Sequence, residues 1–514
     1  MNLRQNPFGR LMPQLRATLL LTSCVLFLAG STVATQAQDA LESELKQLQQ
    51  RQQQELLDMQ RKIEAQKTVL PSDPNFLRKK VTELEAKLKA TETPLAGSKM
   101  DRPAVQKHVD YVWILISGVM VFFMQAGFAM LEMGSSRAKN SINCAMKGLL
   151  DFSSSSISYL LFGFTLMFGP SSGGFIGSHS FWLSDFPASS PLWVFWFFQV
   201  VFCGAACTIA SGAMAERTKF MGYMAYTAFF SGLVYPVFGH WAWGSASTGY
   251  EANFGGGTGW LEALGFVDFA GSTVVHGIGG ACALAGIMVV GPRVGRFDAD
   301  GTPRVMPGHN VPLAFLGTFI LFMAWFCFNA GSTLTGGPEI GRIAVNTCIA
   351  GSSGGFFGLI LIWLLRGAPD AASTMNGLLA GCVAITAPCA CVTPFSALLI
   401  GIIAGVLCSL ATIFMERVKL DDVVGAVPVH LVCGLWGTMA VGIFHESGFN
   451  FSRLGIQAFG SAIIIGGAFV IAYVVFRVID VTIGLRATDM EQEVGLDFAE
   501  HASNAYPDFK TAER

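Results

Sequence analysis

Two apolar stretches of the sequence each carry an aspartate followed eight residues later by a histidine: Asp268 with His276, and Asp422 with His430. Ionisable side chains are costly inside a membrane-spanning segment, so those found there usually serve a function. These four residues are therefore the first candidates for chemistry in the chain.

The two histidines, His276 and His430, offer hydrogen-bond chemistry. A neutral imidazole has one donor and one acceptor, and a pair that shares one hydrogen bond leaves its other nitrogens facing a narrow path. Such a path suits a small polar molecule or a relayed proton, whereas a metal site would need a third or fourth ligand. The alternative is two separate core histidines, each bonded to a backbone carbonyl. Because the two lie at equivalent places, we favour a pore.

The two aspartates, Asp268 and Asp422, stand where their apolar helices begin. Asp is favoured at the start of a helix, where it accepts backbone N–H groups and gains from the helix dipole. A carboxylate near the outer mouth of a pore would also stabilise a cation. Both roles stay open for Asp268.

Aromatic residues supply further candidates. Trp243 falls at the outer end of a predicted span, where its ring face would attract a small cation. Ser332 would add a hydroxyl group, and Phe202 and Phe328 would form an apolar gate that excludes water and ions. The alternative is that these aromatic side chains face lipid or belong to the interfacial belt.

The composition is that of a membrane protein. The 514 residues are 52% hydrophobic and only 13% charged, against about 25% charged in a soluble domain. The net charge of -2 gives no field that favours nucleic acid. The 12 cysteines include no Cys-x-x-Cys pair and are expected to be small buried residues. We find no nucleophile–base motif and no metal cluster, so we expect no enzyme and no cofactor.

The first hundred residues divide into two segments. Residues 1–37 have a basic start, a short apolar core and a small-residue cleavage site, which is typical of a signal peptide. Residues 38–108 form a polar extension outside the membrane, with apolar residues at heptad spacing such as Leu77, Val81 and Leu84. It is either a helical, coiled-coil-like extension or a solvated spacer.

Residues 109–480 are predicted to form an all-α polytopic membrane domain. Its apolar runs predict eleven transmembrane helices, at residues 110–133, 147–169, 191–214, 220–246, 268–291, 311–334, 341–364, 373–391, 394–414, 427–445 and 457–480. Basic residues concentrate in alternate connections, which indicates that these are cytoplasmic. The N-terminus is then outside, and the polar tail at 481–514 is cytoplasmic and would dock on its own helices or on a partner.

The two aspartate–histidine stretches also predict an internal repeat. When they are aligned on the histidines, Gly271 matches Gly425 and Gly280 matches Gly434. The offset is five spans, and an odd offset turns the second copy upside down. We therefore expect an inverted repeat of five plus five spans, with spans 1–5 related to spans 6–10 and one extra C-terminal helix. In such repeats the substrate path lies near the midplane.

Several motifs in order along the chain resemble those of the ammonium transporter family (Amt/Mep/Rh). They are Phe128-Ala129-Met130-Leu131-Glu132-Met133-Gly134, Arg137-Ala138-Lys139-Asn140, Gly212-Ala213-Met214-Ala215-Glu216-Arg217, the stretch from Asp268 to Gly280, Phe328-Asn329-Ala330-Gly331-Ser332 and Pro428-Val429-His430. The chain looks like a bacterial member of this family that carries a signal peptide and an additional extension.

The resemblance implies a transporter in the bacterial inner (plasma) membrane, working as a homotrimer with one pore in each protomer. Ammonium would be recruited at Trp243, Ser332 and Phe202, with Asp268 nearby. It would be deprotonated, and ammonia would pass the gate of Phe202 and Phe328 and the histidine pair. The tail resembles one that receives PII-type regulators. The alternative function is an ammonium sensor built on the same fold.

Overall fold

A computed structural model describes Arg61, Lys79, Thr82, Glu83 and residues 102–250, 254–255 and 257–508. The chain divides into two compact units, Met1–Met100 and Asp101–Arg514. The four described residues of the first unit are helical. The predicted signal peptide lies outside the described residues, and so does nearly all of the extension predicted at 38–108.

Nine helices of the described residues are long and apolar enough to cross a membrane. They comprise α3 (Arg102–Ser135), α4 (Ser141–Ser158) with η3 (Tyr159–Gly163) and α5 (Phe164–Phe168), α6 (Leu192–Ala213), η7 (Ser272–Gly277) with α10 (Ile278–Val290), α11 (Val311–Gly331), α12 (Glu339–Arg366), α14 (Pro394–Arg417), η8 (Val427–Val432) with α15 (Cys433–Phe444), and α16 (Phe451–Thr482). The prediction of a helical multi-pass membrane domain is confirmed.

Helices also occupy the two other predicted spans. One is α7 (Phe220–Phe229), continued by η5 (Phe230–Val234) and α8 (Tyr235–Trp243). The other is α13 (Ala371–Thr386), whose 16 residues are fewer than the ~20 that usually cross a membrane. The first helix begins at Arg102, earlier than the predicted residue 110. Hydropathy marks only the apolar part of a helix, and this one continues into polar sequence.

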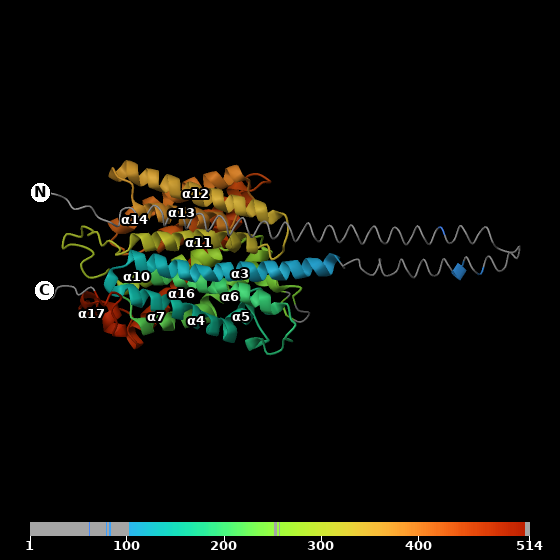
Figure 1. The fold of residues 1–514 in the computed structure, drawn as a ribbon, viewed down its shortest axis with the longest axis horizontal. Helices are drawn as coiled ribbons and strands as arrows, with labels where there is room; N and C mark the ends of the chain where they lie inside the picture. The colour runs from blue at the N-terminus through green and yellow to red at the C-terminus, as the bar shows by residue number, and fades with distance from the viewer. Residues whose placement is uncertain are drawn as a thin grey trace. The chain divides into compact units, whose positions relative to one another are not determined.

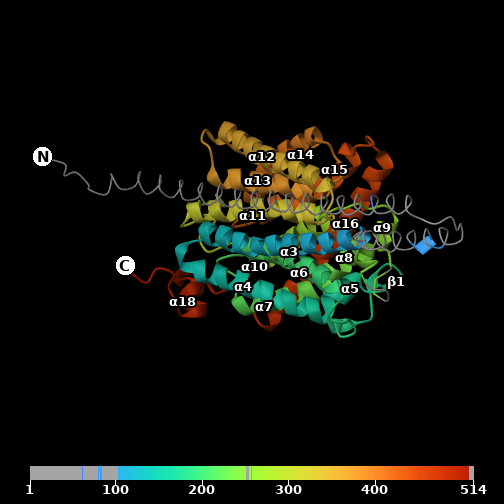
Figure 2. The ribbon, with the colours of Figure 1, turned by 45° about the vertical axis from the view of Figure 1, so that its right-hand side comes forward.

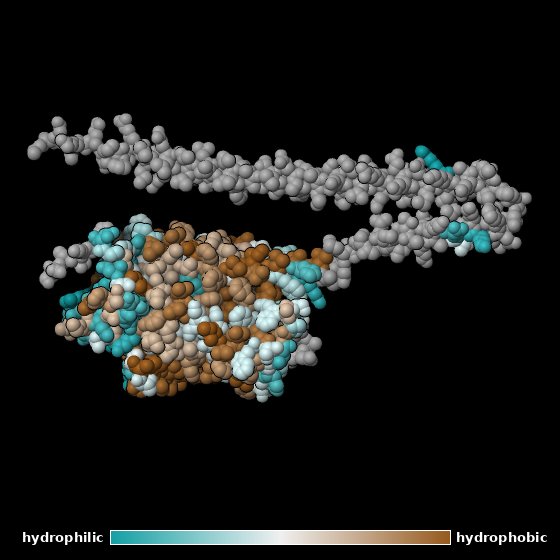
Figure 3. Space-filling model, turned by 60° about the horizontal axis from the view of Figure 1, so that its bottom comes forward, coloured by the Kyte–Doolittle hydropathy of each residue, from teal (hydrophilic) through white to brown (hydrophobic). Residues whose placement is uncertain are grey.

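The helices of the membrane unit run side by side (Figures 1 and 2). Apolar side chains cover the middle of the face drawn in Figure 3, and hydrophilic ones gather toward its ends. Small residues bring α12, α13 and α14 together: a Cβ added at Gly405 would lie 2.2 Å from the carbonyl oxygen of Gly354. Such close backbone approach is typical of membrane helices, where packing replaces the hydrophobic effect.

Short elements lie between the long helices and, in the tail, after the last of them. They are η2 (Ala138–Asn140), a hairpin of β1 (Ser171–Ser172) and β2 (Ile176–Gly177), η4 (Phe181–Leu183), η6 (Gly244–Ser247), α9 (Trp260–Ala263), α17 (Asp489–Val494) and α18 (Leu496–His501). The hairpin, η6 and α9 lie beyond the end of α8, which carries Trp243.

Both histidine-bearing helices open with a π-helical turn, η7 before α10 and η8 before α15. Single π turns inside α-helices are rare and are frequent at functional sites. Each turn follows a glycine with positive φ, +110° at Gly271 and +80° at Gly425, a conformation that a residue with a Cβ adopts only with strain. The matching glycines of the two stretches thus have matching backbone conformations.

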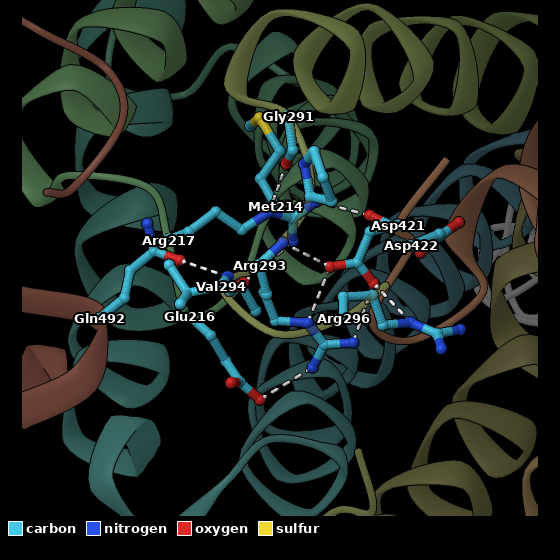
Figure 4. A network of polar contacts seen from close by, with 12 residues as sticks. Met214, Glu216, Arg217, Gly291, Arg293, Val294, Arg296, Asp421, Asp422 and Gln492 are labelled. Atoms are coloured by element: carbon cyan, nitrogen blue, oxygen red, sulfur yellow. Dashed lines mark hydrogen bonds and ion pairs between the residues drawn. The ribbon is translucent and has the colours of Figure 1, made fainter. Parts of the chain in front are cut away.

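Buried charged residues join the connections that follow α3, α6, α10 and α14, and most of them are drawn in Figure 4. Arg293 donates from Nε and Nη2 to the two carboxylate oxygens of Asp421, each at 2.9 Å, and from Nη1 to Glu216 at 3.1 Å. Arg137 completes the row with a 2.5 Å ion pair to Glu216. The carboxylates of Glu216 and Asp421 are fully buried. Four connections that were all predicted to be cytoplasmic are therefore held together at one end.

The C-terminal tail packs against this same end of its own bundle, where α17 lies in Figure 1 and α18 in Figure 2. Arg486 donates to the carbonyl of Val290 at 2.7 Å, and the Lys139 ammonium donates to the carbonyl of Gln492 at 2.8 Å. The backbone N–H of Asn143 donates to Asp497 at 2.8 Å. Docking on its own helices, one of the two predicted roles of the tail, is therefore observed.

Acid is expected to weaken this charged end. Burial alone would raise the pKa of the Asp421 carboxyl, but Arg217 and Arg293 beside it hold that pKa well below its ordinary value. A lowered pKa means that the stabilisation is complete above the ordinary pKa of about 4 and is lost as the pH falls toward the folded value. Thermal unfolding in detergent should show a midpoint that falls from about pH 5 downward. Asp421→Asn should flatten this fall, and parallel curves for the two proteins would contradict the assignment.

Candidate functional site

The two histidines meet inside the bundle. Nδ1 of His276 lies 3.1 Å from Nδ1 of His430, and the ring centroids are 5.2 Å apart with the planes at 27°. The side chains come from η7 and η8, which begin their helices from opposite ends, and both residues are buried. Nε2 of His276 has no hydrogen-bond partner within the described part of the chain. The structure thus brings the pair together and leaves a buried nitrogen for another molecule.

A stack of aromatic rings leads to this pair. Phe202 and Phe328 are stacked with centroids 4.1 Å apart, and Phe328 lies 5.5 Å from His276. The two phenylalanines are at most 2% exposed. The residues predicted as a gate are therefore in contact, and they stand directly before the first histidine.

Trp325 is a further member of this stack, and no role was predicted for it. Its ring lies 5.1 Å from His276, nearly parallel to the imidazole, and its Nε1 donates to Thr386 Oγ1 at 3.0 Å. Trp325 lies one turn before Phe328 on α11, so both rings share one helix face. That spacing is the signal that would have identified it.

A cavity of about 70 Å³ lies beyond the phenylalanine pair and has room for water-sized molecules. We call it the outer cavity, because the predicted topology places this side of the pore outside. Three predicted recruitment residues line it together: Phe202, Trp243 and Ser332. Ser332 donates its hydroxyl proton to the Phe328 carbonyl at 2.8 Å, so its oxygen remains an acceptor. Gln199, which the sequence analysis did not single out, is the further polar residue of the lining.

Asp268 does not line this cavity. Its carboxylate is buried and accepts the backbone N–H groups of Gly271, Thr273 and Val274 at 3.1, 2.9 and 2.8 Å. Its backbone carbonyl accepts the indole N–H of Trp243 at 2.7 Å. The structure thus gives Asp268 the helix-start geometry, and its backbone carbonyl holds Trp243, a residue of the outer cavity.

Asp422 has the same arrangement in the second stretch. It accepts the N–H groups of Gly425, Ala426 and Val427 at 2.9, 3.0 and 2.8 Å. Since both carboxylates already hold three backbone donors, each fixes the π turn that carries a histidine. The likeness between the two stretches therefore extends from residue types to hydrogen bonds.

A second, smaller cavity of about 20 Å³ lies on the far side of the histidine pair. His430 is in its lining together with Phe128, Glu132, Thr208 and Asn376. Apart from His430, none of these residues was given a role by the sequence analysis, although Phe128 and Glu132 belong to one of the family motifs. They come from α3, α6 and α13, so only the folded chain shows that they share a cavity.

The parts form one sequence of environments. An aromatic cavity with polar groups is followed by a closed pair of phenylalanines, then by two buried imidazoles, and finally by a cavity with a carboxylate. Such a row favours a small cation at its outer end and a small neutral molecule with hydrogen-bonding groups in its middle. A hydrated alkali ion finds no comparable set of oxygen ligands in the row that these residues form.

Comparisons with known proteins agree with this arrangement. Residues 112–506 match the model of the Ammonium Transporter Family. The chain is 43% identical to the Ammonium transporter Amt2 of Archaeoglobus fulgidus, over 79% of this chain and 90% of that protein. It is 37% identical to the Ammonium transporter Amt1 of Haloferax mediterranei, over 80% and 82% of the two chains.

Solved structures give the same result. The structure titled Sensor Amt Protein is 41% identical, with a TM-score of 0.74 over 77% of this chain and 99% of that one. Mep2 of Candida albicans is 25% identical, with a TM-score of 0.67 over 75% and 87%. The family match spans the aromatic cavity, both histidines and the docked tail, and the chain therefore belongs to the ammonium transporter family (Amt/Mep/Rh).

Proposed function

We propose that this protein recruits ammonium at the outer cavity, removes its proton and conducts ammonia past the histidine pair into the cytoplasm. The observation that carries the proposal is the row of Trp243, Phe202, Phe328, His276 and His430, which runs from an aromatic cavity to a buried imidazole pair. Relatives named as ammonium transporters support the choice of substrate.

The proposed selectivity depends on the neutral form of the substrate. Ammonium and potassium resemble each other in size and charge, so an outer cation site separates them poorly. Ammonium can give up a proton and continue as ammonia, which accepts and donates hydrogen bonds. Potassium cannot lose its charge, and a bare ion in the buried stack of rings would be very costly. The phenylalanine pair and the histidines therefore act as the filter.

The finer architecture belongs to the same proposal. We infer eleven crossings, with spans 1–5 and 6–10 as inverted repeats, because every predicted span is helical and two of the backbone hydrogen bonds to each aspartate fall at matching positions. We place the charged end and the tail in the cytoplasm of a bacterium, with the protein in the inner membrane as a homotrimer. A PII-type regulator would bind at the tail.

The electrical current that ammonium evokes from the reconstituted protein tests the proposed function. Purified protein in liposomes, adsorbed on a solid-supported membrane, should give a current on addition of ammonium and none on addition of potassium. Liposomes without protein are the control. A protein that gives no ammonium current, or equal currents with both ions, contradicts the proposal.

Trp243 is expected to determine the apparent affinity for ammonium. A desolvated cation–π contact contributes about 2 kcal/mol, so Trp243→Leu should raise the half-saturating ammonium concentration by about tenfold or more. Trp243→Phe is the matched control, because it keeps a ring face while it too loses the indole N–H that bonds Asp268. Concentration series of the current would compare the two. Equal half-saturation for the leucine and phenylalanine variants would exclude a cation–π role.

The second candidate function is that of an ammonium sensor. It is favoured by the 41% identity to the structure titled Sensor Amt Protein. A transporter should restore growth of a transport-deficient cell on low ammonium, whereas a sensor with little transport should not. Failure to restore growth, despite normal insertion in the membrane, would favour the sensor.

A further inference from the structure

The smaller cavity, on the His430 side of the pore, contains a carboxylate with no assigned role. Glu132 lies on α3, one turn before the helix ends at Ser135, and its residue is 2% exposed. The cavity that it lines together with His430 measures about 20 Å³, enough for about one molecule the size of water. Ammonium and ammonia are of this size.

The carboxylate of Glu132 is only partly satisfied. Ser211, near the end of α6, donates its hydroxyl to Oε2 at 2.9 Å. Within the described part of the chain Glu132 takes part in no ion pair. A buried carboxylate is very unfavourable unless it holds a proton or faces a cation. The entry of a small cation would therefore stabilise the ionised form of Glu132.

The buried side chains of Lys147 and Asp151 lie near Glu132 and act on it electrostatically, but each has a hydrogen-bond partner of its own. Lys147 donates to the carbonyl of Thr218 at 2.5 Å, and Asp151 accepts the hydroxyl of Tyr223 at 3.1 Å. Neither residue lines the cavity. Glu132 is thus the acidic residue of this lining, and in its ionised form it gives the cavity the negative character that attracts a cation.

A second acceptor completes the cavity. Asn376 donates from Nδ2 to the Val424 carbonyl at 2.9 Å, which leaves its side-chain carbonyl oxygen as an acceptor. Gly425 and Gly212 also line the cavity, and a Cβ at Gly212 would lie 3.2 Å from Cγ of Glu132. The small residues thus keep open the space in front of the carboxylate.

We propose that Glu132, with Asn376, forms an ammonium-binding site on the inner side of the histidine pair. Ammonia that has passed His430 would take the proton of the Glu132 carboxyl and remain as ammonium beside the carboxylate so formed. The site deepens the proposed function and depends on it for the identity of the ligand. It pairs with the outer cavity: a π face holds the cation at one end of the pore, and a carboxylate holds it at the other.

Infrared difference spectroscopy tests the site directly, without a need for transport. Ammonium chloride is added to the full-length protein in reconstituted membranes, and the carboxyl and carboxylate bands are followed. The wild type should show an ammonium-dependent change in these bands. Glu132→Gln, which keeps the shape and the bond from Ser211, should lose this change. Retention of the same change in Glu132→Gln overturns the proposal.

Two further variants separate a binding role from a structural one. Glu132→Asp keeps the charge on a shorter side chain, and its half-saturation in the infrared titration should rise by about tenfold. Ser211→Ala removes the donor to the carboxylate and should shift the same band without abolishing it. If Glu132→Gln does not fold, the other two variants decide. The proposal is overturned if the ammonium-dependent infrared band is unshifted in Ser211→Ala and the half-saturating ammonium concentration is unchanged in Glu132→Asp. A wild type that shows the band but gives no current refutes transport while the inner site stands.

Discussion

Replacing both His276 and His430 with alanine is expected to abolish the selective ammonium current. The two imidazoles supply the buried polar atoms at the centre of the path, and Nδ1 of each lies 3.1 Å from the other. Without them the path between the phenylalanine pair and the smaller cavity on the His430 side would be apolar and wider. Ammonia would lose its hydrogen-bond partners there, and water could enter. Currents evoked by ammonium and by potassium on solid-supported membranes would measure both effects.

The matched control replaces His309, a histidine outside the pore whose Nδ1 lies 2.9 Å from the carbonyl of Ser136. His309→Ala should keep the ammonium current. The double variant should either conduct nothing or conduct potassium as well. An ammonium current of normal size that still excludes potassium in the double variant would refute the role of the histidine pair.

Asp421→Ala is expected to produce the largest loss of stability. Its carboxylate is fully buried and accepts Nε and Nη2 of Arg293 and the Nε of Arg296. Its backbone carbonyl accepts Nη2 of Arg217, so Asp421 joins three connections. Removal of one partner from a buried ion pair leaves an uncompensated charge and costs about 3–5 kcal/mol. The unfolding midpoint in detergent should fall markedly, and the yield of folded protein with it.

Arg304→Ala provides the comparison for Asp421→Ala. Arg304 pairs with Asp298 at a surface site where its side chain is 63% exposed. Exposed pairs contribute about 0–1 kcal/mol, so this variant should unfold close to the wild type. Similar midpoints for the two variants would show that the buried network does not stabilise the charged end.

The helices of the membrane domain were predictable from the long apolar runs. Inside a membrane such a run must satisfy its own backbone hydrogen bonds, and a helix does so within one segment. Their ends were less so: α3 begins at Arg102, before the predicted residue 110, and α16 begins at Phe451, before the predicted residue 457. Hydropathy records where a helix is apolar, whereas a helix also continues through the polar residues at its ends.

The candidate site was predictable in unequal parts. The approach of His276 and His430 followed from two similar stretches that enter from opposite sides. The grouping of Trp243, Ser332 and Phe202 followed from the family resemblance, since their separation in the sequence says nothing of contact. Their roles in transport remain predictions, while the cavity that they share is a feature of the structure.

Other features depend on which helices become neighbours. Glu132 reaches the inner cavity because α3 packs against α6, and its partner Ser211 lies 79 residues further on. The ion pairs of Arg293 join residues from three separate connections. Charge pairs of this kind have no pattern in the sequence, because any basic residue at a helix end could face any acidic one.

The contact between the two Nδ1 atoms gives the centre of the pore a direction. A hydrogen bond between them requires that one ring carry its proton at Nδ1 and the other ring present a bare Nδ1. In two neutral rings the first then has an accepting Nε2, and the second has a donating Nε2. Two histidines that occupy matching places in their stretches thus offer opposite chemistry to a passing molecule. A molecule of ammonia meets a lone pair at one ring and an N–H at the next. This polarity reverses when the accepting Nε2 takes up a proton, the shared proton moves to the other Nδ1, and the donating Nε2 releases its proton.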